Sequence, residues 1–476
     1  MKLIFKGEKF DLNGFNSDSR KIKKGDLFVA VVGSQVDGHN YIEKSIKNGA
    51  KIIICQTLPV IIRSNITYIQ VKDSIEILGQ IASIWNGEPS KKLHLIGVTG
   101  TNGKTTIVTL LYEIFKKLGY KVGLISTICN CINNRILKTT HTTPDAIVLN
   151  NLLSQMVSEE CKYVFMEISS HAIEQKRIAG LYFRGGIFTN LTRDHLDYHK
   201  TFNVYRNTKK KFFDLLPVDS FALINKDDKN GTFMVQNTKA FKQFYSFQSL
   251  ADFKGKVLEL HFDGTLMAIN NKEFFTLLIG KFNAYNVLAV YGATVLLGHS
   301  PDKILLLLSM LHPILGRFEI LHTSTNFIIV IDYAHTPDAL VNVLDTINEV
   351  LNGRGEIITV FGCGGDRDKG KRPIMAKKAV QLSQNVILTS DNPRFEEPND
   401  IIRDMIYGLN NNQLKKILCI VDREQAIQTA CLLAKPNDVV LIAGKGHENY
   451  QEIKGFKNHF NDKEILMKIS NLRIIN

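Results

Sequence analysis

The stretch from Thr99 to Thr106, with the sequence TGTNGKTT, constrains this chain more than any other segment. It follows an apolar run at 93–98 and opens a segment with helical periodicity. A glycine-rich turn between a strand and a helix presents backbone N–H groups which, with the helix N-terminus and a lysine, hold polyphosphate. Lys104 supplies that lysine, and Thr105 stands where such loops place a Mg²⁺ ligand.

The match to the strict phosphate-loop pattern is incomplete, because Val98 occupies the position of its first glycine. The alternative is an ordinary glycine turn with a surface lysine. The order of apolar run, loop, Lys-Thr pair and helical segment favours the phosphate site.

Apolar residues after the loop recur at the spacing of one helical face. They are Ile107, Leu110, Leu111, Ile114, Phe115 and Leu118. Gly119 ends this helix, and residues 121–127 form the next predicted strand. The loop therefore belongs to a βαβ unit, which predicts an α/β fold with a parallel sheet covered by helices.

The length of 476 residues and the positions of linker-like segments predict three domains. We place an N-terminal α/β domain at 1–89, a central domain with the phosphate loop at 90–316, and a Rossmann-like C-terminal domain at 317–476. Residues 86–90, NGEPS, form the first predicted linker, and Gly316-Arg317 marks the second boundary. Residues 257–262 and 266–269 flank Asp263-Gly264 and predict a hairpin.

The composition argues against nucleic-acid-binding and membrane-spanning classes of protein. The net charge is +13, but the lysines are scattered without a basic, aromatic-rich stripe, so we expect no nucleic-acid partner. The N-terminus has no signal-peptide core, and the longest apolar stretch, 304–311, is too short to span a bilayer. We expect a cytoplasmic monomer without membrane insertion. The seven cysteines, of which Cys129 and Cys131 form the single close pair, are expected to be reduced, buried thiols.

The last third of the chain repeats one pattern, in which an apolar run ends in a polar cluster. The runs are 327–331, 357–361, 386–389 and 439–443, and the clusters are DYAH (332–335), GCGGDR (362–367), DNPR (391–394) and GKGHE (444–448). Open parallel sheets bind ligands beyond the carboxyl ends of their strands, so these clusters predict a ligand-facing edge. The glycines of 362–365 do not meet dinucleotide-binding spacing.

Two further segments carry candidate chemistry. Glu167 lies in an apolar run at 163–168, where a carboxylate can hold Mg²⁺ opposite a phosphate loop; an ordinary strand-end carboxylate is the alternative. Residues 189–199, TNLTRDHLDYH, could bind metal or phosphate or form a salt-bridged surface turn, and the nearby phosphate loop favours the first interpretation. Lysines 209–211 follow; a lysine run usually forms a solvated helix face.

Together these motifs resemble the Mur ligases, the ATP-dependent amide-forming enzymes of bacterial cell-wall precursor synthesis, over essentially the whole chain. The resemblance implies that ATP phosphates bind Gly100, Thr101, Asn102, Gly103, Lys104, Thr105 and Thr106. It implies further nucleotide contacts at Asn283, Asn286, Arg317 and Asp332. Thr105, Glu167 and His195 would organise Mg²⁺, and Lys209 aligns with the family's carbamylated lysine, itself a metal ligand. Lys104, Lys209, His195 and Glu167 would be the catalytic residues, with Lys210 and Lys211 ordinary.

The resemblance extends to the other substrates. The motifs around Asp18-Ser19-Arg20 and at 33–38 resemble a uridine-diphosphate pocket. The implied contacts to the UDP-muramoyl dipeptide are Ser17, Ser19, Ser34, Gln35, Val36, Thr142, Thr143, Ser169, Gln175 and Arg177. The implied contacts to diaminopimelate are Arg367, Asp391, Asn392, Pro393, Arg394, Gly444 and Glu448. Diaminopimelate differs from lysine by one distal carboxylate, and the planar fork of Arg394 suits that group.

The implied activity joins meso-diaminopimelate to the D-glutamate γ-carboxylate of UDP-MurNAc-L-Ala-D-Glu through an acyl phosphate, with ATP and Mg²⁺. Closure of the C-terminal domain onto the central one is expected. A lysine-adding ligase is the nearest alternative, which Arg394 disfavours; a folylpolyglutamate synthase-like ligase is disfavoured by the uridine-pocket motif. A nucleotide-dependent switch or a binding protein without catalysis is disfavoured by Lys104, Glu167, His195 and Lys209.

Overall fold

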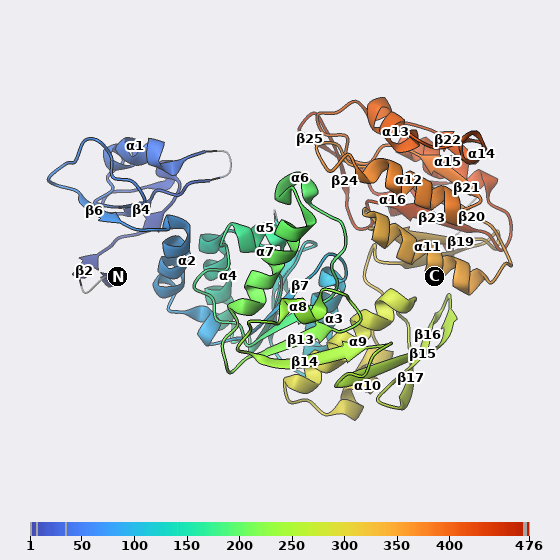
Figure 1. Ribbon diagram of the computed structural model, residues 1–476, viewed down its shortest axis with the longest axis horizontal. Coiled ribbons are helices and arrows are strands. Elements are labelled where there is room, and N and C mark those ends of the chain that lie inside the picture. The colour runs from blue at the N-terminus through green and yellow to red at the C-terminus, as the bar shows by residue number, and fades with distance from the viewer. Residues whose placement is uncertain (1, 6–7, 34–35, 140, 470–473, 476) are drawn as a thin grey trace.

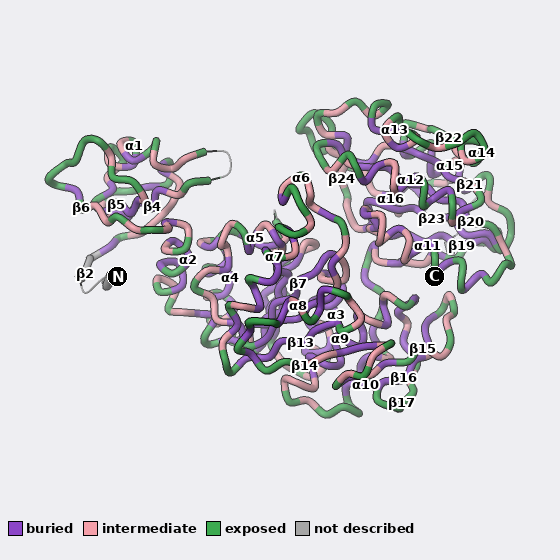
Figure 2. The backbone as a smooth tube through the Cα atoms, in the orientation of Figure 1, coloured by how far each residue is buried: buried purple, intermediate pink, exposed green. Residues whose placement is uncertain are grey.

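The computed structural model describes residues 2–5, 8–33, 36–139, 141–469 and 474–475. Three bodies follow one another, with the N-terminal body at one end, the central body between, and the C-terminal body at the other end (Figure 1). Each is built on its own sheet, and buried residues concentrate along the strands of the two larger bodies (Figure 2).

The N-terminal body holds a four-stranded parallel sheet in the order β3-β4-β5-β6. Its strands are β3 (Phe15–Asn16), β4 (Leu27–Val29), β5 (Ile52–Cys55) and β6 (Thr67–Gln70), preceded by the hairpin β1 (Lys2–Phe5) and β2 (Glu8–Asp11). Its helices are η1 (Ser19–Lys21), η2 (Gly38–Tyr41), α1 (Ile42–Lys47) and α2 (Ser74–Trp85). The helix α2 joins this body to the next, because Lys176 forms ion pairs with Asp73 at 2.5 Å and Glu76 at 2.9 Å.

The central body is an eleven-stranded sheet in the order β10-β9-β8-β11-β7-β12-β13-β14-β15-β16-β17, parallel from β8 to β15 and antiparallel at both edges. Its strands are β7 (His94–Thr99), β8 (Val122–Ile125), β9 (Asn130–Ile132), β10 (Arg135–Leu137), β11 (Tyr163–Glu167), β12 (Gly185–Phe188), β13 (Phe221–Asn225), β14 (Phe241–Ser246), β15 (Phe253–His261), β16 (Gly264–Ile269) and β17 (Lys272–Thr276). Its helices are η3 (Pro89–Lys91), α3 (Lys104–Lys117), α4 (Ala146–Ser158), α5 (Ser170–Glu174), α6 (Leu196–His199), α7 (Phe202–Asp214), α8 (Gly231–Met234), α9 (Lys281–Leu296) and α10 (Pro301–Ser309).

Two hydrophobic cores cover the two faces of the central sheet. One contains the apolar face of α3 with α9 and α10, and the other contains α4 and α7. The predicted βαβ unit is confirmed as β7, α3 and β8, and the predicted hairpin as β15 and β16. Parallel strands with helices on both faces confirm the predicted α/β class.

The C-terminal body is a seven-stranded sheet in the order β22-β21-β20-β23-β19-β18-β26. Its strands are β18 (Glu319–Thr323), β19 (Ile328–Asp332), β20 (Ile357–Phe361), β21 (Asn385–Leu388), β22 (Ile417–Cys419), β23 (Val439–Ala443) and β26 (Ile474–Ile475), with a separate hairpin of β24 (Tyr450–Ile453) and β25 (Phe456–His459). Its helices are α11 (Pro337–Leu351), α12 (Lys371–Leu382), α13 (Pro398–Ile406), α14 (Asn411–Leu414), α15 (Arg423–Leu433) and α16 (Asp462–Lys468). The four predicted runs are the adjacent parallel strands β21, β20, β23 and β19, so their polar clusters share one edge as predicted.

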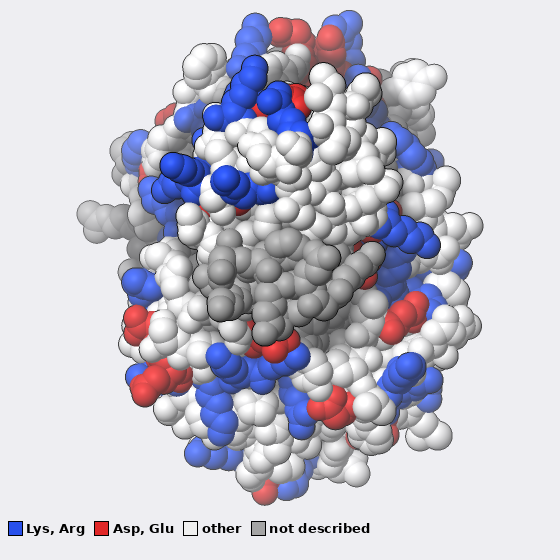
Figure 3. Space-filling view, turned by 90° about the vertical axis from the view of Figure 1, so that its left-hand side faces the viewer, with Lys and Arg blue, Asp and Glu red and all other residues white. Residues whose placement is uncertain are grey.

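Surface and thiol predictions have mixed outcomes. Basic and acidic side chains are interspersed on the face that carries the N-terminal body (Figure 3). None of the described helices is both long and apolar enough to cross a bilayer. All seven cysteines are free, as expected, but Cys419 is exposed and Cys129 half-buried, so the expectation that every thiol is buried was wrong.

Candidate functional site

The turn after β7 is held in the shape of a phosphate loop by close contacts that only glycine permits. Gly100 has φ +151°, and a Cβ there would lie 1.9 Å from the Thr189 hydroxyl oxygen. Gly103 has φ +88°, and a Cβ there would lie 2.5 Å from Asn286 Oδ1. The backbone amide of Asn102 also donates to Asn190 Oδ1 at 2.9 Å. The loop is therefore fixed from behind by the segment that follows β12.

Lys104 begins α3 and lies over this loop. Its Nζ donates to the carbonyl oxygens of Gly100 at 3.0 Å and Thr101 at 2.7 Å. Burial lowers the pKa of Lys104, while the Glu167 and Asp194 carboxylates favour its charged form. The Lys104 ammonium is placed to exchange these carbonyl oxygens for the phosphate oxygens of an incoming polyphosphate.

Glu167 ends β11 directly opposite the loop and is 1% exposed. Thr127 orients its carboxylate, because the Thr127 amide donates to Oε1 at 2.8 Å and the Thr127 hydroxyl to Oε2 at 3.2 Å. A cavity of about 160 Å³ is lined by Lys104, Thr105, Glu167, His195 and Lys209, among others. The structure thus brings together the five residues that the sequence proposed for catalysis and metal binding.

His195 enters this cavity from a left-handed backbone conformation with φ +54°. Its Nε2 lies 3.3 Å from Asp194 Oδ2, and its ring meets the His171 ring edge-on at a centroid distance of 4.8 Å. Burial lowers the pKa of His195 to about 3, so the imidazole is neutral at physiological pH. Burial raises the pKa of Asp194, but His195, His335, Lys371 and Lys104 together lower it to about 2.

The donor atoms that face this cavity suit a Mg²⁺ ion whose remaining coordination positions are filled by substrate oxygens. Among the residues that the structure describes, no three His, Cys, Asp or Glu side chains converge to hold a metal on their own. The carboxylate of Glu167, the hydroxyl of Thr105 and the imidazole of His195 nevertheless line one cavity. Mg²⁺ typically takes one or two protein carboxylates and fills its shell with phosphates and water, so this sparse donor set fits it.

Lys209 contradicts the general expectation that a lysine run is a solvated face. It is 1% exposed, donates to the Gly100 carbonyl oxygen at 2.8 Å, and lies 4.9 Å above the Tyr205 ring. Burial and the charge of Lys104 hold the pKa of Lys209 well below its ordinary value. Lys210 is also buried and pairs with Asp214 at 2.6 Å, whereas Lys211 is exposed. The run spans both faces of α7, because successive residues on a helix point about 100° apart.

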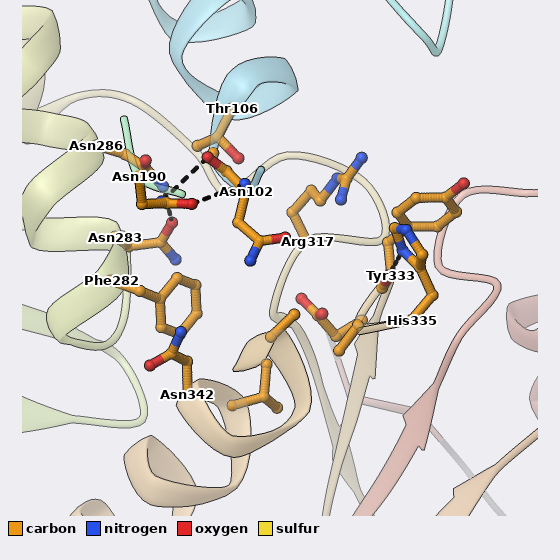
Figure 4. A pocket seen from close by; sticks show the side chains of 15 residues that line it. Asn102, Thr106, Asn190, Phe282, Asn283, Asn286, Arg317, Tyr333, His335 and Asn342 are labelled. Carbon is orange, nitrogen blue, oxygen red and sulfur yellow. Dashed lines mark hydrogen bonds between the residues drawn. The ribbon is translucent and has the colours of Figure 1, made fainter. Parts of the chain in front are cut away.

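A second cavity adjoins the loop between α3, α9 and the C-terminal sheet (Figure 4). It contains the predicted Asn283, Asn286, Arg317 and Asp332. Arg317 reaches back to the Thr105 hydroxyl at 3.2 Å, and its guanidinium carbon lies 4.4 Å from the Tyr333 ring centroid. Burial raises the pKa of Asp332 to about 6. Amides, a cation and aromatic rings around one space can hold a planar, polar ligand.

Sequence reasoning gave no individual role to several residues of this second cavity. They are Phe282, Tyr333, His335 and Asn342, whereas Asn190 lies in the segment 189–199 that was proposed for metal or phosphate. Tyr333 and His335 belong to the polar cluster after β19, so the strand-end pattern contained a signal for them. Phe282 and Asn342 lie on helices α9 and α11, where their spacing resembles that of ordinary helix residues.

The C-terminal strand ends form a third group around Arg394. The Arg394 backbone has φ +52°, its Nη1 donates to the Gly365 carbonyl oxygen at 2.7 Å, and its Nε lies 3.3 Å from Glu452 Oε2. Gly365 N also donates to the Asn392 carbonyl oxygen at 2.9 Å, which joins the loops after β20 and β21. These contacts fix the guanidinium in a defined direction.

The buried Lys445 and the partly buried Glu448 form the inner part of this group. Asn392 Nδ2 donates to Glu448 Oε2 at 2.9 Å, and Lys445 Nζ lies 3.3 Å from the same oxygen. Burial and the Asp391 carboxylate raise the pKa of Glu448. Gly444 has φ +109°, and a Cβ there would lie 2.8 Å from Asp391 Oδ2. Pro393 is buried beside Asn392, whereas Arg367 stands at the exposed rim.

Sequence reasoning gave Lys445 no individual role within its cluster and missed the hairpin β24–β25. Lys445 has 0% exposure although it carries a charge. In the hairpin, Glu452 accepts the Arg394 amide on its carbonyl oxygen at 3.0 Å and donates its own amide to Asn392 Oδ1 at 2.9 Å. The hairpin consists of mostly partly buried residues in β24 and exposed residues in β25 and carries no chemical signature, which explains why it was overlooked.

The residues predicted for a sugar nucleotide fall into two separate groups. Ser17, Ser19 and Val36 line one groove of the N-terminal body, while Ser34 and Gln35 lie outside the described residues. The others belong to the central body, where Arg177 donates to the Thr143 carbonyl oxygen and to Gln175 Oε1, both at 2.7 Å. Thr142 and Ser169 line the cavity of Glu167.

The central and C-terminal bodies meet directly at the site. Arg193 Nε lies 3.1 Å from Asp368 Oδ2, and Asn102 Nδ2 donates to Asp338 Oδ2 at 3.2 Å. The phosphate loop and the C-terminal strand ends therefore face a shared space.

Comparison with known proteins gives one consistent result. Three family models match in order along the chain: "Mur ligase family, catalytic domain" at residues 11–85, "Mur ligase middle domain" at 98–294, and "Mur ligase, glutamate ligase domain" at 316–446. A protein of Parabacteroides distasonis named UDP-N-acetylmuramoyl-L-alanyl-D-glutamate–2,6-diaminopimelate ligase is 58% identical over 98% of this chain and 96% of its own length.

Solved structures agree with this result. A structure of a UDP-N-acetylmuramoyl-L-alanyl-D-glutamate–2,6-diaminopimelate ligase is 32% identical with a TM-score of 0.69, covering 98% of both chains. The MurF ligase of Thermotoga maritima, in complex with ADP, shares the fold at 19% identity and a TM-score of 0.61, covering 90% of this chain and 93% of its own. The phosphate loop, the carboxylate opposite it and these matches along the chain show that the protein belongs to the Mur ligase family.

Proposed function

We propose that this protein joins meso-diaminopimelate to the γ-carboxylate of D-glutamate in UDP-N-acetylmuramoyl-L-alanyl-D-glutamate, using ATP, in peptidoglycan precursor synthesis. The observation that carries the proposal is the shared space between the two bodies. The cavity with Lys104, Glu167 and His195 is also lined by Tyr333 and His335, which follow β19, and β19 belongs to the same sheet edge as the strand that precedes Arg394. The names of the high-identity relatives point to the same reaction.

The reaction proceeds in two balanced steps in this proposal. A γ-carboxylate oxygen attacks the γ-phosphorus of ATP, and ADP leaves, which gives an acyl phosphate. The amine of diaminopimelate then attacks the acyl carbon, inorganic phosphate leaves, and the nitrogen loses a proton. Enzymes of this chemistry act mainly by positioning and by neutralising charge.

The residues of the first cavity would divide these tasks. The loop 100–106 holds the phosphates, and Lys104 offsets charge on the transferring phosphoryl group. Thr105, Glu167 and His195 would hold Mg²⁺, which when bound neutralises negative charge on the phosphate oxygens. Asn283, Asn286, Arg317 and Asp332 would contact the nucleotide in the second cavity.

Lys209 is proposed to act as a carbamate and hence as a further anionic metal ligand. A carbamate forms when a neutral amine attacks CO₂ and loses a proton. The burial of Lys209 beside Lys104 favours the neutral amine. A negative charge at this position would also offset the charge of Lys104 nearby.

The remaining predicted residues are proposed to bind the other two substrates. The N-terminal body, residues 1–89, would hold the uridine diphosphate, and the central body, 90–316, the dipeptide through Thr142, Thr143, Ser169, Gln175 and Arg177. The C-terminal body, 317–476, would bind diaminopimelate, with Arg394 on its distal carboxylate. A cytoplasmic location and a monomeric state stay predictions.

The test is phosphate release from ATP with UDP-N-acetylmuramoyl-L-alanyl-D-glutamate, comparing meso-diaminopimelate with L-lysine. We expect release with diaminopimelate only. Release with lysine would retain the ligase and remove the specificity assignment. No release with either amino acid would contradict the proposal.

A further inference from the structure

Two thiols lie side by side near the turn that orients the Glu167 carboxylate of the first cavity. Cys129 Sγ is 3.5 Å from Cys131 Sγ, and Cys129 is half-buried while Cys131 is buried. The reaction proposed above uses neither of them. Within the described residues, the other five cysteines make no such contact with another thiol.

Cys129 ends a tight turn that connects β8 to β9. Ser126 Oγ donates to the Cys129 carbonyl oxygen at 2.8 Å and accepts the Cys129 amide at 3.2 Å. Thr127 lies inside this turn and supplies the two hydrogen bonds that orient Glu167, at 2.8 and 3.2 Å. The position of Cys129 and the orientation of Glu167 therefore depend on the same four residues, 126–129.

We propose that Cys129 and Cys131 are a modification site for small-molecule disulfides, and that the bridge formed between them displaces Thr127 from Glu167. The sulfurs must approach from 3.5 Å to about 2.0 Å in a disulfide. Because one residue separates the two cysteines, backbone next to the turn must absorb this movement. The hydrogen bond from Cys131, with that from Ser126, lowers the pKa of Cys129 against the opposing effect of burial, while the same contact raises the pKa of Cys131, which favours Cys129 as the attacking sulfur.

The chemistry is a thiol–disulfide exchange in two steps. The Cys129 thiolate attacks one sulfur of the small disulfide, and one small thiol leaves. The Cys131 thiol then loses its proton, attacks Cys129 Sγ and releases the second small thiol. Two protein thiols are oxidised and one small disulfide is reduced to two thiols, and an excess of dithiol reverses both steps.

The experiment treats the full-length chain with oxidised glutathione, alkylates free thiols and digests with trypsin. The expected fragment 122–135 contains Cys129 and Cys131 and no other cysteine. After oxidation we expect this fragment to carry no alkyl group and to have a mass lower by two hydrogens than the reduced, unalkylated fragment. We also expect faster amide exchange in the same fragment, because the Thr127 amide loses its bond to Glu167. A fragment that keeps both alkylatable thiols, or a bridged fragment with unchanged exchange, would overturn the proposal.

Two variants distinguish the effect of a bridge between Cys129 and Cys131 from the effect of oxidising other thiols. Cys129→Ser should form no bridge and keep slow exchange under oxidant, whereas Cys419→Ser, which removes an exposed thiol on β22, should respond as the wild type does. If Cys129→Ser responds like the wild type, the assignment is wrong.

The effect on catalysis rests on the proposed function. Loss of a side chain that orients a metal ligand typically costs 10–100-fold in metal affinity, so oxidation should raise the Mg²⁺ concentration required for phosphate release at least about 10-fold, reversibly. An unchanged Mg²⁺ dependence in the bridged protein would overturn the proposed link between the disulfide and metal binding at Glu167. A reduced wild type without phosphate release would count against the proposed function alone, since fragment mass and exchange are read without turnover.

Discussion

The nucleotide side and the amino-acid side of this site are constructed differently. The phosphate loop is contiguous in sequence, and its shape depends on backbone conformation at Gly100 and Gly103. The amino-acid side is assembled from the ends of four strands and held by charged side chains, among them Arg394, Lys445 and Glu448. A local backbone motif tolerates little change, whereas a network of separate side chains can change in specificity while the fold remains.

The largest effect is expected at the nucleotide side. Lys104→Ala should lower turnover by about 10³-fold, as loss of a single preorganised group that stabilises transition-state charge does. Steady-state phosphate release measures this loss. Lys117→Ala, at the exposed end of the same helix, is the matched control and should be silent. Lys104→Ala with ordinary ligation would show that the phosphate loop does not hold ATP.

Arg394→Ala comes next and acts on selectivity. The Arg394 side chain is 18% exposed and would be covered by the bound amino acid, so its loss from the pair with the distal carboxylate should cost about 2–5 kcal/mol in kcat/KM for diaminopimelate. Lysine, which lacks the distal carboxylate, should be used no worse than before. Arg403→Ala, on the surface of α13, provides the control. Equal losses for both amino acids would show that Arg394 supports the fold of the pocket without reading the carboxylate.

How far the sequence predicts this structure also differs between the two sides. Helix periodicity and glycine spacing gave β7, the loop and α3 to within a few residues, because those signals are local. Apolar runs also gave the four strands of the C-terminal edge. The partners of Arg394 could not be found in this way, because Glu452 contacts it through a hairpin whose position depends on tertiary packing. Burial of Lys209 and Lys210 was likewise invisible, since sequence alone does not state which helix face packs inward.

Lys445→Met tests the buried charge that sequence reasoning missed. Removal of the ammonium leaves Glu448 without one of its partners, which should cost about 1–3 kcal/mol of stability, measured by urea unfolding. The pKa of Glu448, already raised by burial and Asp391, should rise further because Lys445 favours the ionised form. The acid limb of kcat/KM for diaminopimelate should therefore move to higher pH.

Lys454→Met removes an exposed lysine nearby and serves as the control. An acid limb that does not move in Lys445→Met would mean that ionised Glu448 is not required for binding the amino acid. Unchanged stability would mean that water replaces the ammonium.

The smallest effect is expected where the two sides meet. Arg193 and Asp368 join the central and C-terminal bodies, and their side chains are 43% and 13% exposed. Pairs this accessible contribute about 0.2–1 kcal/mol, so Arg193→Ala should lower kcat/KM by no more than about fivefold. The loss should shrink at high salt, because screening weakens the pair in the wild type as well.

Arg184→Ala is the appropriate control, since Arg184 is as exposed as Arg193 but pairs with Asp219, at 2.8 Å, within the central body. A salt-sensitive loss confined to Arg193→Ala would indicate that this pair helps to hold the two sides together during turnover. Equal, small losses in both variants would instead assign them to general surface electrostatics. A loss of the size expected for Arg394→Ala would mean that Arg193 acts on the substrates through the adjacent Asp194 and His195, so that the two sides of the site would be less independent than their construction suggests.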